Sequence, residues 1–274
     1  MANYLITGVS GGMGTAICRL LTAKGHTVWG LDRSDPPMPD SFHFIRTDIT
    51  QSNEIEAAFE TIRTSSVRLD GIIHAAGIYD LASLVEMTEE DFIRDFNVNL
   101  FGMFRVNKIF LPLLAKKARI VIISSELAPL HPLPFTGIYA ITKTALESYA
   151  SALRMELQLL GHSVIVIRPG AVHTAMLPAS TAKLDQFCSS TRLYRFSSGR
   201  FRKIVESIEA KHISPDRIAS LIDQVLRAAH PRLVYSINRN PLLLLYQLLP
   251  PRLPEETARL LRVRSRRNAK PSFQ

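Results

Sequence analysis

Short apolar runs alternate along the chain with longer stretches in which apolar residues recur every three or four positions. The short runs are rich in β-branched residues and predict strands that are buried on both faces. They occupy residues 3–7, 27–31, 43–47, 71–74, 119–123, 164–167 and 231–236. Helical patterns lie between them, so the sequence predicts an α/β protein. We expect a doubly wound, mainly parallel sheet of about seven strands with helices on both faces.

A glycine-rich turn joins the first predicted strand to the first helix. Its residues include Gly8, Ser10, Gly12, Met13 and Gly14. Glycines here let the backbone approach a pyrophosphate, whose charge is favourable beside the free N–H groups of the helix N-terminus. The turn alone is weak evidence. It gains weight from Asp32 at the end of the second strand, where a carboxylate can bind the hydroxyls of an adenosine ribose.

Asp32 also bears on the choice between NAD and NADP. Beside this carboxylate, the 2′-phosphate of NADP would meet like-charge repulsion on the order of 4 kcal/mol, for a unit pair at about 4 Å and an effective dielectric of about 20. The sequence therefore favours NAD. Arg33 follows directly and can turn towards a phosphate, so NADP stays open as the alternative.

Further residues reach the same predicted edge of the sheet. The third strand ends at Asp48 and Ile49, where the adenine ring is expected, and the fourth runs into the small residues Ala75, Ala76 and Gly77. In an open α/β sheet, ligands bind beyond the carboxyl ends of the strands. These stretches therefore predict one dinucleotide crevice.

Tyr139 and Lys143 lie four residues apart in a helical pattern, so both side chains face the same side of the helix. A nearby ammonium favours the phenolate and lowers the phenol pKa from about 10. The pair alone is no better than a chance spacing, but Ser124 and Ser125 end the fifth predicted strand nearby. Asn99 interrupts the apolar face of an earlier helical stretch, where an amide either satisfies a local carbonyl or holds a water or a kink in a proton path.

Composition and charge exclude several other classes. The 274 residues are 46% hydrophobic and 21% charged, which is typical of a soluble globular protein. No apolar run reaches about 18 residues and no signal peptide opens the chain, so a cytoplasmic location is expected. Cys18 and Cys188 are isolated and the histidines show no ligand spacing, so we expect no disulfide framework and no metal site.

The net charge of +9 is concentrated at one end of the chain. Residues 251–274 hold seven cations and two glutamates and so supply +5 of it. Basic and aromatic residues are not interleaved as a nucleic-acid platform requires, so no nucleic-acid partner is expected.

Taken in order, the motifs resemble those of the short-chain dehydrogenase/reductase family over roughly residues 3–180. They read Thr7-Gly8-x-x-x-Gly12-x-Gly14, Ala75-Ala76-Gly77, Asn99-Leu100-x-Gly102, Ser124-Ser125, Tyr139-x-x-x-Lys143 and Pro169-Gly170-x-Val172-x-Thr174. The resemblance implies a Rossmann fold and an active tetrad of Asn99, Ser125, Tyr139 and Lys143. It also implies that the nicotinamide carboxamide meets Thr174 and the backbone of Val172, after the turn at Pro169 and Gly170.

The chain departs from the family pattern in three places. The usual Asn-Asn-Ala-Gly turn reads His74-Ala75-Ala76-Gly77. Ser125 lies 14 residues before Tyr139, one more than expected, which leaves Ser124 as a weaker candidate. The glycine spacing also fits the family's longer sugar-nucleotide epimerases, but only about a hundred residues follow Pro169, which favours the shorter oxidoreductase branch.

The resemblance implies an NAD(H)-dependent enzyme that interconverts a secondary alcohol and a ketone, with a hydrophobic substrate such as a hydroxysteroid. Tyr139 is expected to act as general acid and base, and Lys143 to lower its pKa and bind the nicotinamide ribose. Ser125 is expected to hold the substrate oxygen, and Asn99 to support a proton-relay water. The alternatives are an NADP-dependent carbonyl or retinoid reductase and a non-catalytic dinucleotide sensor.

The substrate side is expected to lie in the last hundred residues. Residues 175–212 mix small polar, aromatic and basic side chains, which predicts either a cover whose aromatic residues line an apolar pocket or a solvated helix pair. The dehydrogenase domain is expected over 1–240, and an apolar and then basic extension over 241–274. We expect this extension to pack on the pocket or on a second subunit, in a homodimer or homotetramer; peripheral contact with an anionic membrane is the alternative.

Overall fold

The computed structural model describes residues 1–130, 132–174, 176–195, 197–209, 211–241 and 243. Two expectations fall largely outside the described residues: the role of Phe196 in the cover, and the apolar and basic extension beyond Leu243. The side chains at 39, 176–180 and 207–209 are likewise not described.

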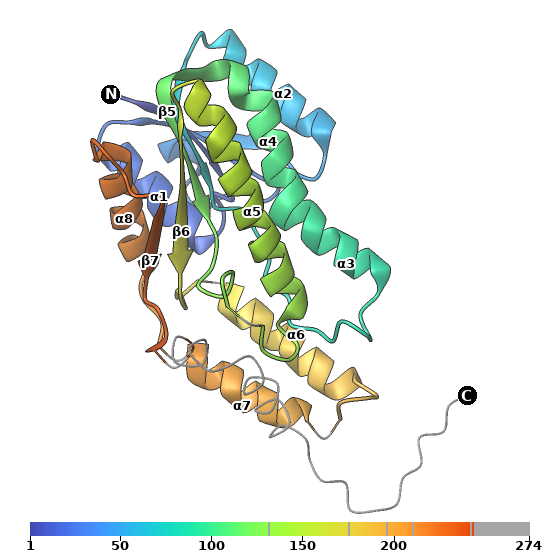
Figure 1. Cartoon of the computed structure of the whole chain (residues 1–274). Coiled ribbons are helices and arrows are strands. Elements are labelled where there is room, and N and C mark those ends of the chain that lie inside the picture. The colour runs from blue at the N-terminus through green and yellow to red at the C-terminus, as the bar shows by residue number, and fades with distance from the viewer. Residues whose placement is uncertain (131, 175, 196, 210, 242, 244–274) are drawn as a thin grey trace, which may run out of the picture.

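Seven parallel strands form a single sheet in the order β3-β2-β1-β4-β5-β6-β7 (Figure 1). They are β1 Asn3–Thr7, β2 Thr27–Asp32, β3 His43–Arg46, β4 Leu69–His74, β5 Leu114–Ile123, β6 Ser163–Pro169 and β7 Val234–Ile237. The predicted doubly wound fold is confirmed. The strand order reverses between β1 and β4, and a sheet of this kind opens its ligand crevice at the carboxyl ends of the strands on either side of such a reversal.

Helices cover both faces of the sheet and one of its ends (Figure 1). Their bounds are α1 Gly12–Ala23, α2 Ser52–Thr64, α3 Glu89–Phe96, α4 Gly102–Phe110, α5 Gly137–Leu159, α6 Met176–Ser190, α7 Ser198–Glu209 and α8 Pro215–Arg227. One core cluster joins the sheet to α2, α4 and α5, and a second joins it to α1 and α8. Large side chains such as Phe110, Ile17 and Ile72 are fully buried there, and each such burial contributes about 1.5–3 kcal/mol.

The helical stretch that contains Asn99 is divided into three pieces between Thr88 and Leu111. Thr88 caps α3 by accepting a hydrogen bond from the Asp91 backbone N–H at 3.1 Å. A π-helical turn, Asn97–Phe101, then separates α3 from α4. Such turns are rare and often occur at functional sites, and this one contains Asn99.

The first residues of two strands differ most from the sequence expectation. β5 begins at Leu114 rather than at 119, because Leu114 pairs with Leu69 across an irregularity in the β4–β5 register. β7 begins at Val234 rather than at 231, since Pro231 has no N–H to donate and the Arg232 N–H donates to the Tyr235 hydroxyl instead.

Candidate functional site

A cavity of about 560 Å³ lies at the carboxyl ends of β1 and β4. Most of the residues expected to bind a dinucleotide line it: Gly8, Gly12, Met13, Gly14, Asp32, Arg33, Asp48, Ile49, Ala75, Ala76, Gly77 and Thr174. Two glycines are required by close approach. Gly8 has φ +77°, and a Cβ on it would lie 2.5 Å from the Ala76 nitrogen; a Cβ on Gly14 would lie 2.0 Å from the Gly8 oxygen. The residues present therefore fit a dinucleotide that rests on backbone.

The Asp32 carboxylate is held in place by backbone donors. Its Oδ2 accepts from Ser10 N at 2.9 Å and its Oδ1 accepts from Ser34 N at 3.0 Å. Ser10 was expected to touch the cofactor, but it does not line the cavity; it positions Asp32, and its hydroxyl donates to the Ser34 carbonyl. Arg33 also lines the cavity, so the carboxylate and a cation stand side by side at this end.

A second, smaller cavity of about 110 Å³ adjoins the first. The two share Met13, Ala75, Ala76, Gly77, Ile78 and Thr174 in their walls. Ser125, Tyr139 and Lys143 line the second cavity, together with the Pro169–Val172 turn. The groups expected to carry the chemistry therefore lie in a cavity that shares walls with the crevice expected to hold the cofactor.

Ser125, rather than Ser124, is free to act in this cavity. The Ser124 hydroxyl donates to Glu147 Oε1 at 2.7 Å, and Glu147 is paired with Arg168 behind the site. Ser125 interacts instead with the Tyr139 phenol, and this hydrogen bond lowers the phenol pKa.

Lys143 contacts both the sheet and the tyrosine. Its Nζ donates to the Ile123 carbonyl at 3.1 Å and lies 5.6 Å from the centre of the Tyr139 ring. Burial lowers the pKa of Lys143 to about 8, against the opposing charge of Glu147.

The expected lowering of the Tyr139 pKa does not appear in the chain as described, where the net shift is upward. Burial raises the pKa of Tyr139 to about 12, and only the Ser125 hydrogen bond acts against it. The physical reason is that both groups are withdrawn from water, which penalises the phenolate and the ammonium alike.

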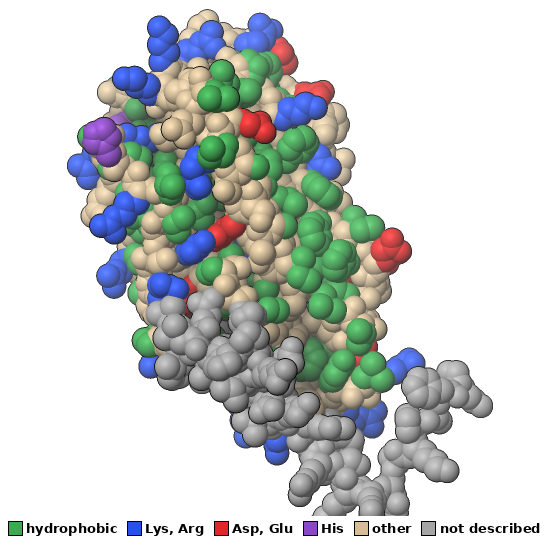
Figure 2. Space-filling model, in the orientation of Figure 1, with side chains coloured by type: hydrophobic (Ala, Val, Ile, Leu, Met, Phe, Trp, Pro, Cys, Tyr) green, Lys and Arg blue, Asp and Glu red, His purple; other side chains and the backbone are tan. Residues whose placement is uncertain are grey.

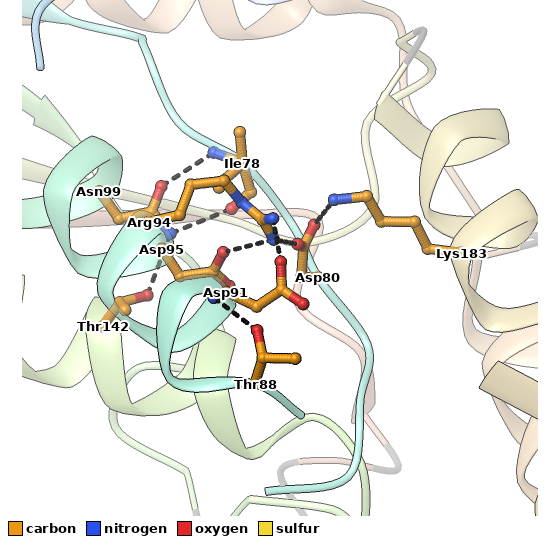
Figure 3. Close-up of polar contacts among 9 residues, drawn as sticks. All are labelled: Ile78, Asp80, Thr88, Asp91, Arg94, Asp95, Asn99, Thr142 and Lys183. Atoms are coloured by element: carbon orange, nitrogen blue, oxygen red, sulfur yellow. Dashed lines mark hydrogen bonds and ion pairs between the residues drawn. The ribbon is translucent and has the colours of Figure 1, made fainter. Parts of the chain in front are cut away.

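Asn99 acts as a clamp between two elements (Figure 3). Its Oδ1 accepts from Ile78 N at 2.8 Å, and its Nδ2 donates to Ile78 O and to Thr142 Oγ1, each at 3.0 Å. Both amide N–H donors are thus occupied, and the side chain joins the loop after β4 to the helix of Tyr139. The sequence left open whether this amide bonds to a local carbonyl or holds a water in a proton path. In the structure it bonds to a backbone carbonyl, that of Ile78 in a neighbouring loop.

Helices α6 and α7 form a cover with a core of their own. Leu184, Phe187, Phe201 and Val205 are buried there against Leu81. The described aromatic residues of the cover therefore pack inside it, and none of them lines the catalytic cavity, contrary to the expected pocket lining. Phe135, from the loop before α5, contacts the tilted Phe187 ring and meets Phe201 edge-to-face, so both rings pack against it rather than in the catalytic cavity.

Ion pairs hold the cover against the rest of the chain (Figure 3). Asp80 receives Lys183 from α6 and Arg94 from α3, and both cations also line the larger cavity. Glu86 accepts three further bonds, from the Thr191 hydroxyl and from the backbone N–H groups of residues 192 and 193.

Sequence reasoning missed several residues of the site. Asp80 and Lys183 are 103 positions apart, and no local pattern links them. Glu126 lines the catalytic cavity. Its place directly after Ser125 was the one feature of the sequence that could have predicted this.

The family model described as short chain dehydrogenase matches residues 2–185 of the chain. The chain is 28% identical over 228 residues to a 3-ketodihydrosphingosine reductase of Bacteroides thetaiotaomicron, which covers 83% of this chain and 84% of that protein. It is 29% identical over 256 residues to retinol dehydrogenase 16 of Mus musculus, which covers 84% of this chain and 78% of that protein.

A solved structure shares the fold. The crystal structure of a short chain dehydrogenase family protein from Francisella tularensis subsp. tularensis SCHU S4 superposes with a TM-score of 0.73 at 24% identity, over 86% of this chain and 97% of that one.

Proposed function

Because the chain belongs to the short-chain dehydrogenase family, we propose that it is an NAD(H)-dependent oxidoreductase that interconverts a secondary alcohol and a ketone on a hydrophobic substrate. One observation carries the proposal: Ser125, Tyr139 and Lys143 line a cavity that shares six wall residues with the crevice above the glycine turn. A sensor that only bound the dinucleotide would need none of these three side chains in that space.

The roles follow from the chemistry of the groups. The nicotinamide supplies or accepts the hydride. Tyr139 exchanges a proton with the substrate oxygen, and Ser125 donates a hydrogen bond to the same oxygen. Lys143 binds the nicotinamide ribose, and its charge favours the phenolate. Asn99 fixes the loop after β4, and the second lone pair of its Oδ1 supports a water that links Lys143 to solvent.

NAD is proposed over NADP because of Asp32. Its two carboxylate oxygens are oriented by Ser10 N and Ser34 N towards the adenosine end of the crevice. A ribose diol can donate to this carboxylate, whereas a 2′-phosphate would be repelled by it. Arg33 is the feature that favours the alternative, an NADP-dependent carbonyl or retinoid reductase.

The substrate is proposed to be lipid-like. The relatives named above act, by their names, on a ketodihydrosphingosine and on retinol. A hydroxysteroid belongs to the same hydrophobic class. The catalytic cavity supports such a substrate because Tyr79, Leu127 and Ile78 form part of its wall.

A substrate panel tests the proposal. Steroid, retinoid and long-chain ketones and alcohols would each be offered with NAD(H) and with NADP(H), and turnover followed by the absorbance of the reduced nicotinamide. We expect turnover of at least one lipid-like pair. Tight dinucleotide binding without turnover of any member would instead support the non-catalytic sensor.

We further propose that the chain forms homodimers or homotetramers. Hydrophobic side chains gather on the side of the molecule where α3, α4 and α5 lie (Figure 2). Phe101 and Phe104 are each 44% exposed there, and Met155 is 69% exposed. A second copy would remove this apolar surface from water. Light scattering of wild type and of Phe104→Glu tests this, because a monomeric wild type would contradict it.

Peripheral membrane contact remains a proposal for the extension beyond Leu243. None of the described helices is long and apolar enough to cross a membrane. Co-sedimentation with anionic vesicles, comparing the full chain with one lacking 244–274, tests surface contact directly. Equal pelleting of the two proteins would exclude it.

A further inference from the structure

A carboxylate for which the proposed mechanism has no use lines the catalytic cavity. Glu126 follows Ser125 directly and is only 6% exposed. Burial raises the pKa of this carboxyl group. A buried carboxylate is costly unless it is paired or hydrogen-bonded, so the partners of its two oxygens indicate what the group does.

The side chain is fixed from two sides. Glu126 N donates to the Pro169 carbonyl at 2.9 Å, and Oε2 accepts from the Asn240 backbone N–H at 2.7 Å. A Cβ on Gly170 would lie 2.9 Å from Oε1, so the carboxylate rests against bare backbone. The group is therefore held in one position before any substrate arrives, which reduces the entropy lost on binding.

The other oxygen is left for a ligand. Within the part of the chain that the structure describes, no group donates a hydrogen bond to Oε1. Arg239 acts on Glu126 through its charge, but it is an exposed side chain and forms no ion pair with Glu126 among the described residues. An ionised carboxylate can only accept hydrogen bonds, so the missing partner is a donor.

We propose that Glu126 binds an ammonium group that the substrate carries beside its reacting carbon, so that the substrate pair is a 2-amino ketone and its amino alcohol with an apolar chain. This inference rests on the proposed function and narrows its substrate class. In the reduction, hydride passes from the reduced nicotinamide to the carbonyl carbon and a proton passes from Tyr139 to the carbonyl oxygen. The ammonium is unchanged.

Charge and spacing favour an ammonium over other donors. A charge-assisted bond between an ammonium and a carboxylate is about twice as strong as a neutral one, and it offsets the desolvation of Glu126. Ser125 and Glu126 are consecutive residues and both line the catalytic cavity of about 110 Å³, so the substrate groups that meet them lie in the same small space. An anionic group at that place would be repelled, so Glu126 also selects against keto acids.

The test uses two matched long-chain ketones and two matched variants. One ketone carries an amine on the carbon next to the carbonyl, and the other carries hydrogen there. Glu126→Gln keeps the shape of the side chain and an oxygen that can accept from Asn240, while it removes the charge. Glu60→Gln, at an exposed glutamate of α2 that pairs with Arg63, controls for the loss of one negative charge.

For the amino ketone, Glu126→Gln is expected to raise KM by about tenfold to a hundredfold, as the loss of a hydrogen bond between charged groups predicts. For the plain ketone, kcat/KM is expected to change by less than about threefold, and Glu60→Gln should leave both substrates unaffected. Equal losses on the two ketones would overturn the inference, because they would show that Glu126 only supports the fold. A wild-type enzyme with no preference for the amino ketone would overturn it as well.

A binding measurement separates this inference from the proposed function. Calorimetric titration of the enzyme and NADH with the amino alcohol, and with its counterpart lacking the amine, needs no turnover, because cofactor and alcohol are both already reduced. Stronger binding of the amino alcohol to wild type, lost in Glu126→Gln, supports the ammonium site even if neither ketone is reduced. Equal binding of the two alcohols would overturn it while turnover of a ketone still upheld the proposed function.

Discussion

The Nζ atom of Lys143 lies 5.6 Å from the centre of the Tyr139 ring, one helical turn away on α5. The two groups have opposite responses to their shared burial. It raises the pKa of Tyr139 to about 12 and lowers the pKa of Lys143 to about 8. Burial thus favours the neutral form of each group, and the Tyr139 phenol is protonated at neutral pH.

Replacing Tyr139 by phenylalanine removes only the hydroxyl. We expect Tyr139→Phe to lose nearly all turnover, at least about a thousandfold, since general acid–base catalysis contributes about 10²–10⁴. Binding of NAD(H), measured by fluorescence titration, should stay within a few-fold. A variant with a near-normal rate would remove Tyr139 from the chemistry.

The two reaction directions are expected to depend differently on pH. Because burial raises the pKa of Tyr139 to about 12, the phenol is ready to donate a proton over the neutral range, while the phenolate that oxidation needs becomes more populated as the pH rises. Oxidation should therefore accelerate above neutrality, and reduction should not. Lys143→Met removes the charge that favours the phenolate, so oxidation at neutral pH should fall at least tenfold and its rise should move to higher pH. Parallel pH–rate profiles in the two directions would refute this assignment.

Asp32 is expected to set the cofactor preference. Asp32→Asn keeps an acceptor for one of the two backbone donors, Ser10 N and Ser34 N, and removes the charge. The ratio of kcat/KM with NAD to that with NADP should fall at least about tenfold, because a fraction of the like-charge repulsion is already worth more than about 1.4 kcal/mol. Steady-state kinetics with both cofactors measure the ratio. An unchanged ratio would show that groups other than Asp32 set the cofactor preference, with Arg33 as the first candidate.

His74 is expected to make the fold sensitive to acid. It is 4% exposed, and burial lowers its pKa to about 4 although Asn107 Oδ1 accepts a bond from its Nε2 at 2.8 Å. The unfolded chain, in which the histidine pKa is about 6.5, binds more protons between the two values. The contribution of His74 is therefore intact above about pH 6.5 and is lost as the pH falls towards 4.

Between pH 7 and pH 5, linkage gives a loss of about 2 kcal/mol from His74. Denaturant unfolding of wild type and of His74→Asn at the two pH values isolates this loss as the difference between the proteins. The comparison between the two proteins is needed because burial raises the pKa of Asp95 to about 6. The protonation of Asp95 increases the free energy of unfolding as the pH falls over the same range, which opposes the effect of His74. Equal pH dependence in both proteins would show that His74 does not titrate as described.

The amino-acid sequence by itself determined the fold and the edge of the sheet at which the predicted site residues meet. In apolar runs such as 119–123 and 164–167, the side chains on both faces of the strand are apolar and must be buried. A central strand of a parallel sheet, covered by helices on both faces, meets this requirement. The glycine turn, Asp32 and the spacing of Tyr139 and Lys143 are local patterns. Once the strands are parallel, their carboxyl ends meet at one edge, and these residues converge there whatever the loops do.

Only the tertiary structure decided which groups face the cavity and in what state. Ser124 and Ser125 are equivalent by position, and the choice between them depends on Glu147, 23 residues away from Ser124. The Tyr139 pKa depends on how deeply the ring is buried, which spacing along a helix does not express. The bonds from Lys183 to Asp80 and from Asn240 to Glu126 join residues more than 100 positions apart. Sequence periodicity reports which face of an element is buried, but it contains no information on which distant group that face meets.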